Sequence, residues 1–317
     1  MAAANANFDQ IVATTLKNYR HKLADNITGQ QALIYLLKER GYFEERDGGE
    51  TIVEPLLLGE NSTVGSYSGW DILDISPQEG ISACEVAWKQ IAGSVTINGR
   101  EEFQNSGSKT KIVSLLESKV KQLEISMRNE VNEQLFSDGT GNGGKDITGL
   151  ELMVEDGTAW GTYGGIDSNV TTIWRNVWKD EAGALDLASM RNVVNSVRKG
   201  KSACDLIITT QDVYEVYESL ALSNNQITRT SNKLGDAGFE NLEFKGKPMV
   251  YDEDCTSGTM YFLNSEYMKM VVGKGKYFTN TPFQRPDDQD SKVSQVLLYC
   301  NLVTMNRNRL GNLNGIV

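Results

Sequence analysis

The sequence is short of the residues on which most catalytic, metal and disulfide sites depend. Its 317 residues include one histidine, five prolines and four cysteines. The lone histidine, His21, leaves Ser-His-Asp and Cys-His catalysis a single candidate, and a solvated helix position is the simpler interpretation. The cysteines have no paired spacing, which predicts buried, reduced thiols and neither a zinc site nor a disulfide framework. They are Cys84, Cys204, Cys255 and Cys300.

Long apolar runs and an N-terminal targeting pattern are also missing. No apolar stretch approaches the ~20 residues that a bilayer span needs. The opening MAAANANFDQ has no basic region that leads into an apolar one. We therefore expect a protein without a membrane partner that is made and kept in a cytoplasm.

Positive charge is in deficit, with 31 Lys and Arg against 42 Asp and Glu and a net charge of -11. Nucleic-acid readers bind through basic residues that displace counterions, so this balance argues against a dedicated one. It is compatible with an acidic container in which DNA slides and packs. The length exceeds one average domain, which predicts two compact units or one unit with large excursions.

The first hundred residues are expected to form an arm and a long extended hairpin. Residues 8–23 and 28–40 have helical periodicity, but they are too few for a core and should lie along another surface. Two strands follow, TIVEPLLLG and ISACEVAWKQIAGSVTING, and Pro55 restricts the first to a sheet edge. The long connection between them carries four side chains that are too apolar for a solvated loop and need a partner. These are Trp70, Ile72, Leu73 and Ile75.

The second strand changes its apolar phase partway along. Val86 and Trp88 fall on one face, whereas Ile91, Val95 and Ile97 fall on the other. This shift predicts either a bulge or a change of packing partner. A strand buried on both faces is the less favoured alternative because the segment is rich in Ser, Gly, Gln and Asn.

A long amphipathic helix is predicted at 109–136. Its apolar residues recur at spacings of three and four, and the rod would be roughly 40 Å long. Such a stripe is usually core packing, and a cofactor site on it is the less favoured interpretation. The stripe consists of Ile112, Leu116, Val120, Leu123, Met127, Val131 and Leu135.

The glycine-rich segment 139–146, GTGNGGKD, imitates nucleotide-binding and calcium-binding loops. Nucleotide loops follow a strand and precede a helix, whereas here a helix precedes and a strand, ITGLELMV, is expected to follow. Asp146 replaces the magnesium-binding hydroxyl, and Gly149 stands where a calcium loop needs a bidentate Glu. We interpret the segment as a turn at a helix end.

The remaining acidic groups do not form a recognisable site either. The runs 252–254 and 287–290 lie in expected turns, where charges usually face solvent. The sequence therefore predicts no enzyme activity, no cofactor and no metal.

The second half alternates helices and strands. A helix is expected at 185–198, followed by the strand CDLIITT and the helix QDVYEVYESLAL. Further strands are expected in FENLEFKGKPMVYDED, in GTMYFLNSEYMKMVVG and in a terminal strand or strand pair, SKVSQVLLYCNLVTMNRNRL. The fold class is α+β.

The order of hairpin, long helix, glycine turn and Thr-Gly-Leu strand resembles the major capsid proteins of tailed bacteriophages that share the fold first seen in phage HK97. Encapsulin shells use the same fold. The resemblance covers nearly the whole chain and is one of architecture. It implies an N-terminal arm (1–48), an E-loop hairpin (49–100), a peripheral domain (101–201 and 287–317) that contains the spine helix 109–136, and an axial domain (202–286).

This resemblance implies a shell subunit that assembles with itself into pentamers and hexamers. The shell would be an icosahedral head that encloses double-stranded DNA without sequence-specific binding, and the protein would reside in the virion capsid after assembly in the host cytoplasm. A separate scaffolding protein, a portal and decoration proteins are implied as partners. The four apolar residues of the hairpin tip would contact neighbouring subunits. An encapsulin-like compartment is the alternative.

Overall fold

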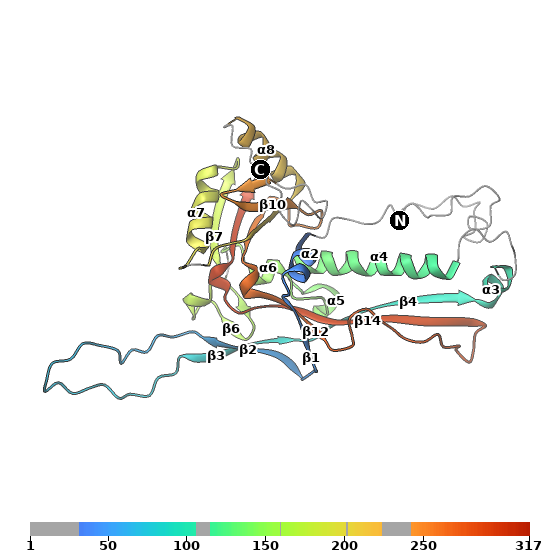
Figure 1. Ribbon diagram of the computed structural model, residues 1–317, viewed down its shortest axis with the longest axis horizontal. Helices are drawn as coiled ribbons and strands as arrows, with labels where there is room; N and C mark the ends of the chain where they lie inside the picture. The colour runs from blue at the N-terminus through green and yellow to red at the C-terminus, as the bar shows by residue number, and fades with distance from the viewer. Residues whose placement is uncertain (1–31, 106–114, 159, 201, 224–241) are drawn as a thin grey trace.

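The computed structural model describes residues 32–105, 115–158, 160–200, 202–223 and 242–317. These residues form two sheets, a long helix that lies along one of them, and a hairpin that extends far from the body (Figure 1). His21, the expected helix at 8–23 and the first residues of the helix expected at 109–136 lie outside the described residues.

One sheet is built around the 14-residue strand β14 (Ser291–Thr304). The C-terminal part of β14 pairs antiparallel with β12 (Met268–Gly273), and its N-terminal part pairs antiparallel with β4 (Lys89–Asn98). Two short strands complete it, β1 (Phe43–Arg46) beside β12 and β13 (Thr279–Asn280) beside β14. One strand therefore spans the base of the molecule and holds partners from both ends of the sequence.

The long helix α4 (Leu115–Phe136) lies along β4. It approaches closely because β4 has Gly93 at the crossing, where a Cβ would lie 2.4 Å from Leu123 Cδ1. Further along α4, Met127, Val131 and Leu135 are buried in the larger hydrophobic core. The predicted amphipathic helix is confirmed over its described length.

The predicted change of phase near Trp88 marks a change of partner. Before it, β3 (Ile81–Ala87) pairs with β2 (Thr51–Leu57), and after it β4 pairs with β14. Val86 therefore faces the core from one strand and Val95 faces α4 from the other. The interpretation as a strand buried on both faces is wrong, because alternate residues of β4 are exposed.

The second sheet has six strands in the order β7–β15–β11–β8–β10–β9. Helices α7 (Leu187–Val197) and α8 (Gln211–Ser223) pack on one face and form a second hydrophobic core with it. The other face joins the larger core, so β8 is buried on both sides. The strands are β7 (Val177–Gly183), β15 (Gly311–Ile316), β11 (Met260–Leu263), β8 (Leu206–Thr209), β10 (Lys247–Tyr251) and β9 (Leu242–Phe244).

The expected strand ITGLELMV is wrong. This segment contains the helical turn α6 (Leu150–Met153), preceded by the short turn α5 (Gly141–Gly144). The apolar residues that suggested a strand, Ile147, Leu150 and Met153, recur every third residue, which is a helical spacing, and all are buried. The helix expected at 185–198 and the strand expected at CDLIITT are present as α7 and β8.

Part of the expected arm belongs to the body. The helix α2 (Ala32–Glu39) buries one face in the larger core of its own chain, so its partner surface is internal. Its buried residues are Ala32, Leu33, Leu36 and Leu37.

The two sheets also cross the expected domain limits. β12 from the segment 202–286 joins the first sheet, and β15 from the segment 287–317 joins the second. The remaining elements are α3 (Gly99–Asn105), β5 (Thr162–Tyr163), β6 (Ile166–Asp167), η1 (Thr172–Trp174), η2 (Ser265–Tyr267) and η3 (Arg307–Arg309).

Candidate assembly surface

The two faces of the β2–β3 ribbon have different surroundings. Ile52, Glu54 and Leu56 of β2, with Cys84 and Val86 of β3, turn toward the body and are buried. On the opposite face, Leu57 and Ile81 stand directly across from each other, and both are about four-fifths exposed. Val53, Pro55 and Ala83 continue this outer apolar face. The root of the hairpin thus carries an uncovered apolar strip on the chain by itself.

Three groups of the body fix the root of the hairpin. The carbonyl of Gly164, in the β5–β6 turn, accepts from the amide of Glu85 at 2.9 Å. The Asn301 side chain donates to the carbonyl of Ala87 at 2.8 Å. Arg46 donates to the carbonyl of Val53 at 3.2 Å and forms an ion pair with Glu54. The hairpin therefore leaves the body in a defined direction.

Gly164 is required for this contact. Its φ is +60°, and a Cβ at this position would lie 2.1 Å from Cys84 Sγ. A side chain would separate the β5–β6 turn from β3.

Pro55 limits hydrogen bonding along the outer edge of the β2–β3 ribbon. The amide of Leu58 donates to the carbonyl of Gly80, so alternate residues of β2 point their amides toward β3. By this alternation the nitrogen of Pro55 points away from β3, toward the outer edge. Pro55 removes a donor from that edge, as the sequence predicted for an edge strand.

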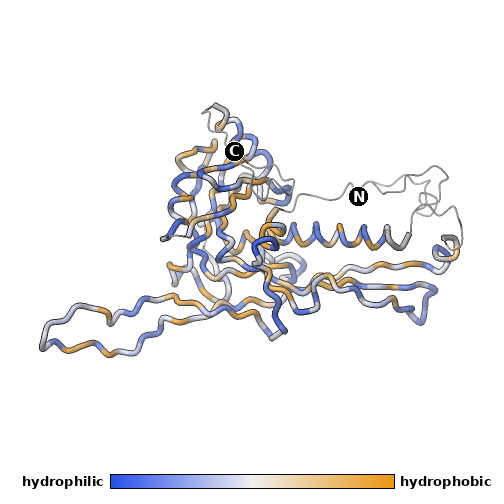
Figure 2. Tube along the Cα trace, in the orientation of Figure 1, coloured by the Kyte–Doolittle hydropathy of each residue, from blue (hydrophilic) through white to orange (hydrophobic). Residues whose placement is uncertain are grey.

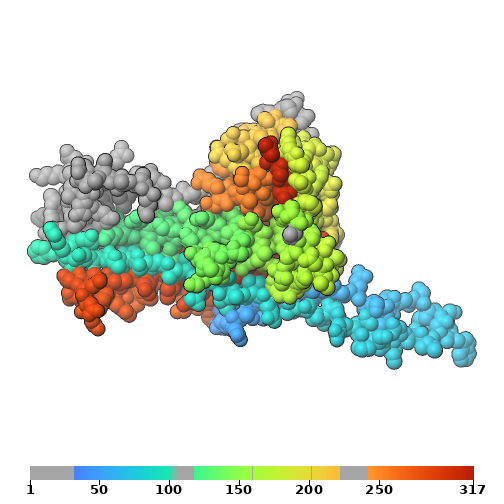
Figure 3. All heavy atoms as spheres, turned by 180° about the vertical axis from the view of Figure 1, so that it is seen from behind, coloured from blue at the N-terminus to red at the C-terminus, as the bar shows by residue number. Residues whose placement is uncertain are grey.

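The connection between β2 and β3, which carries the four apolar residues of the predicted contact, extends away from the body (Figures 1 and 2). Trp70 and Ile72 are fully exposed, Ile75 nearly so, and Leu73 more than half. Short polar contacts shape the loop: Ser62 Oγ donates to Gln78 Oε1 across it at 2.9 Å. The space-filling view shows the hairpin as a separate limb (Figure 3).

A buried arginine organises the base on which the hairpin stands. Arg307 lies between β14 and β15 and is inaccessible to solvent. Its Nε donates to the carbonyl of Met153 at 2.8 Å, its Nη1 to Ser168 Oγ at 2.7 Å, and its Nη2 lies 2.9 Å from Glu155 Oε2. Its guanidinium carbon lies 5.4 Å from the ring centre of Tyr163, beside the turn that contacts β3.

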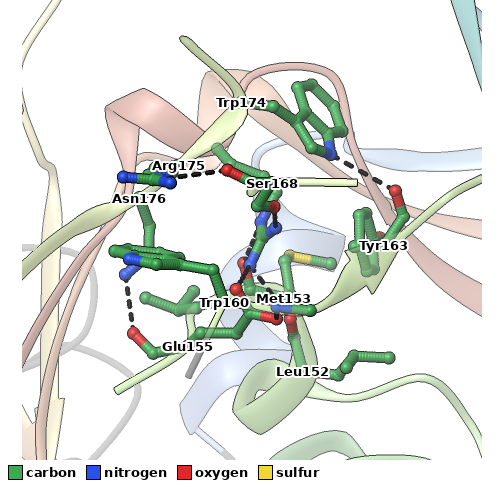
Figure 4. Close-up of polar contacts among 12 residues, drawn as sticks. Leu152, Met153, Glu155, Trp160, Tyr163, Ser168, Trp174, Arg175 and Asn176 are labelled. Carbon is green, nitrogen blue, oxygen red and sulfur yellow. Dashed lines mark hydrogen bonds and ion pairs between the residues drawn. The ribbon is translucent and has the colours of Figure 1, made fainter. Parts of the chain in front are cut away.

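The surroundings of Arg307 are themselves hydrogen-bonded (Figure 4). Trp174 Nε1 donates to the carbonyl of Tyr163 at 3.2 Å, and Asn176 Nδ2 donates to the carbonyl of Glu155 at 2.8 Å. The sequence did not identify this network, because only the fold brings residue 307 beside residues 152–176.

The glycine-rich segment that imitates nucleotide-binding and calcium-binding loops has a structural role. In 138–146, Asp138 accepts from the amide of Thr140 at 2.8 Å, and Asn142 donates to Asp146 at 2.7 Å, so the loop satisfies its own polar groups. A helix precedes it and the turn α6 follows, which is not the strand-loop-helix order of a nucleotide site. Within the part of the chain that the structure describes, no three His, Cys, Asp or Glu residues are grouped to hold a metal.

The cysteines are free and buried, as predicted. Burial raises the pKa of Cys84 and Cys300 to about 12 and that of Cys204 to about 11, which keeps these thiols protonated.

The acidic turn 252–254 corrects another expectation. Glu253 and Asp254 are exposed, but Asp252 is buried and accepts from Asn132 of α4 at 2.8 Å. Burial raises the pKa of Asp252 to about 6. The run 287–290 is exposed as expected.

No helix among the described residues has the length and apolar character needed to cross a membrane.

No protein-family model and no curated protein matches this sequence. Solved structures do match. A chain of the cyanophage A-1(L) capsid asymmetric unit aligns with a TM-score of 0.76 at 17% identity, over 95% of this chain and 97% of that one. The SrpI encapsulin of Synechococcus elongatus PCC 7942 aligns with a TM-score of 0.64 at 12% identity, over 98% and 96%. The capsid of Myoviridae phage XM1 aligns with a TM-score of 0.57 at 11% identity, over 94% and 96%.

The fold is therefore that of shell-forming proteins, with helices and sheets mixed as the α+β class predicts. More closely, the chain has the HK97-like fold of phage major capsid proteins, which encapsulins share.

Proposed function

We propose that this chain is a major capsid protein that assembles into pentamers and hexamers. These close into an icosahedral phage head that encloses double-stranded DNA. The observation that carries the proposal is the extended hairpin, which presents fully exposed Trp70 and Ile72 far from its own body. The capsid fold over nearly the full chain supports it.

Such a hairpin is a liability in a monomer. An exposed apolar limb with open edges promotes aggregation unless a partner covers it. A second copy of the chain supplies that partner through a heterologous contact, and repeated heterologous contacts close into rings. We assign the contact to Trp70, Ile72, Leu73 and Ile75.

The domain assignment belongs to the same proposal. Residues 1–48 serve as the N-arm, 49–100 as the E-loop, 101–201 with 287–317 as the peripheral domain, and 202–286 as the axial domain. A scaffolding protein, a portal and decoration proteins complete the virion capsid, assembled in the host cytoplasm.

An encapsulin-like compartment is the second candidate, because the SrpI shell protein matches over 98% of this chain. The contents of purified particles separate the two functions. Genomic DNA inside the particles supports the head, and an enclosed enzyme supports the compartment.

The test of assembly replaces Trp70, Ile72 and Leu73 by Ser in the full chain. Trp70 and Ile72 are fully exposed and Leu73 is more than half exposed, so the variant is expected to melt at the wild-type temperature. It is also expected to yield few particles by sedimentation and negative-stain microscopy. A Val317→Ser variant, which removes an equally exposed apolar side chain at the C-terminus, is the control. Unchanged particle yield in the triple variant would contradict the assignment of the tip.

A further inference from the structure

Charge is unequally divided between the two helices that cover the six-stranded sheet. From α7 through the turn after it, residues 187–200 contain Arg191, Arg198 and Lys199 and no acidic residue. The helix α8 contains Asp212, Glu215 and Glu218 and no basic residue. This separation is notable in a chain with a net charge of -11, where a uniform surface would be acidic throughout.

Each set of charges lies on the solvent side of its helix. Arg191 and Asn195 of α7, at the spacing i, i+4, and Arg198 at its C-cap are exposed, whereas Met190, Val193 and Val194 face the core. On α8, Asp212 and Glu215 follow the spacing i, i+3 and are exposed, and Glu218 at i+6 is half-buried. Both stripes are about 10 Å long.

The charges of these stripes form no ion pair with one another or with other residues in the part of the chain that the structure describes. Glu215 accepts from Gln211 of its own helix, at 2.9 Å. Lys245 donates to Asn195 at 3.0 Å and adds a further positive charge beside α7.

The two helices cover different parts of the sheet. α7 contacts β7, β15 and β11, and α8 contacts β10 toward the other end of the strand order. Two different and complementary surfaces on one chain are what a head-to-tail contact requires, because each copy offers one surface to the copy before it and the other to the copy after it.

We propose that the basic stripe of α7 in one copy docks against the acidic stripe of α8 in the next copy. This contact fixes the head-to-tail orientation of neighbouring subunits in a ring. The proposal rests on the proposed shell function and specifies one of its interfaces. Charge complementarity of exposed groups directs pairing and rejects wrong partners more than it adds affinity.

The experiment reverses the charges in the full-length protein. One variant carries Arg191→Glu and Arg198→Glu, a second carries Glu215→Arg and Glu218→Arg, and a third carries all four changes. Asp212 is left in place because a carboxylate in the first turn stabilises the helix. Either reversal alone is expected to lower the yield of capsomers and particles roughly tenfold by like-charge repulsion. The variant with all four substitutions is expected to restore the yield.

Co-expression of the first two variants gives a sharper result. Each finds a complementary charge only in the other, so they must alternate around a ring, which is possible in a hexamer and impossible in a pentamer. Hexamers without closed shells are therefore expected. Neutral Arg191→Gln with Arg198→Gln gives an intermediate loss without adding negative charge to α7. Lys145→Glu with Lys274→Glu, at exposed sites away from both helices, controls for net charge.

The outcomes separate this contact from the shell function itself. If the wild-type chain assembles and the charge reversals do not change the yield of particles, the α7–α8 contact is overturned and the proposed shell function stands. Normal particle yield with reduced nucleic-acid content would assign α7 to phosphate binding and also overturn it. A wild-type chain that forms neither capsomers nor particles would overturn both proposals.

Discussion

Gly149 lies where the chain turns back against the end of α4. A Cβ at this position would approach the backbone carbonyls of Ser137, Gln134 and Leu135 within 2.4 to 2.6 Å. These oxygens belong to backbone that has no room to yield, because Leu135 and Phe136 are buried.

Replacement of Gly149 by Ala is therefore expected to lower the free energy of unfolding by about 2 to 4 kcal/mol, since α4 and α6 would have to separate. Thermal or chemical denaturation of the purified variant measures this. Gly183→Ala is the control, because a Cβ there meets nothing within 4 Å and its φ is not positive. Equal losses in the two variants would show that the steric account of Gly149 is wrong.

Asp252 is a second residue whose surroundings determine its chemistry. Its Oδ1 accepts from Asn132 and from the amide of Asp254, while its buried Oδ2 has no hydrogen-bond partner among the described residues. Burial raises its pKa to about 6 from an ordinary value of 3.8. The folded state thus retains a proton that the unfolded state releases.

The pH dependence follows from this difference. Below pH 4 both states are protonated and the stability is complete, whereas between pH 4 and 6 only the unfolded state ionises and stability falls. Asp252→Asn stays neutral, so it should equal the wild type near pH 4 and exceed it by up to about 3 kcal/mol near pH 8. Melting curves across this range measure the gap, and the exposed Glu253→Gln should show none. A stability difference between Asp252→Asn and the wild type that does not change with pH would refute the raised pKa of Asp252.

The role of a single residue could be predicted from the sequence where its cause is local, and could not where its cause is tertiary packing. Pro55 lies on the outer edge of its strand because its missing amide dictates that position. Asp252 looked like one of three solvated acids in a turn, because nothing local indicates that α4 covers the first of them.

At the scale of elements, Arg307 joins segments that lie far apart in the sequence. It connects the strand pair β14 and β15 to α6 and to the loop that carries the β5–β6 turn. That turn holds β3 through Gly164 and Glu85. The direction of the hairpin therefore depends on a buried charge that does not touch it.

Arg307→Met is expected to cost about 3 to 5 kcal/mol, because it leaves Glu155 and two carbonyls buried without their partner. It should also loosen the root of the hairpin, which faster hydrogen exchange at the Glu85 amide would reveal. Arg309→Met, two residues further along the chain and partly exposed, is the comparison. Protection of Glu85 that is unchanged in the Arg307 variant would show that the turn is held by other contacts.

Helices and strands were predictable where the periodicity of apolar residues was long or changed abruptly. The apolar stripe of α4 and the phase change at Trp88 are both visible in the sequence, because apolar residues occupy the positions that face a packing partner. ITGLELMV misled because its β-favouring residues are packed by the end of α4, which overrides their propensity. The pairing of β1 with β12 and of β7 with β15 was not predictable, since each pair joins strands that lie far apart in the sequence.

At the scale of the whole molecule, the hairpin and the body are separable. The Cβ position of Gly59 lies 3.3 Å from the Cα of Gly80, so the two strands are already close where the distal loop begins. The described polar contacts of residues 61–78 are with one another. Both cores lie in the body and the root of the hairpin.

A chain in which residues 60–79 are replaced by a two-residue Asn-Gly turn should therefore fold. Its melting temperature should stay within a few degrees of the wild type, since it keeps β2, β3 and both cores. It should remain unassembled under conditions in which the wild type forms particles, because the apolar tip is gone. A Gly/Ser loop of the original length keeps the reach of the hairpin and removes only its apolar side chains. If that loop assembles and the short turn does not, reach is what the shell requires. If both fail, the side chains of the tip carry the contact.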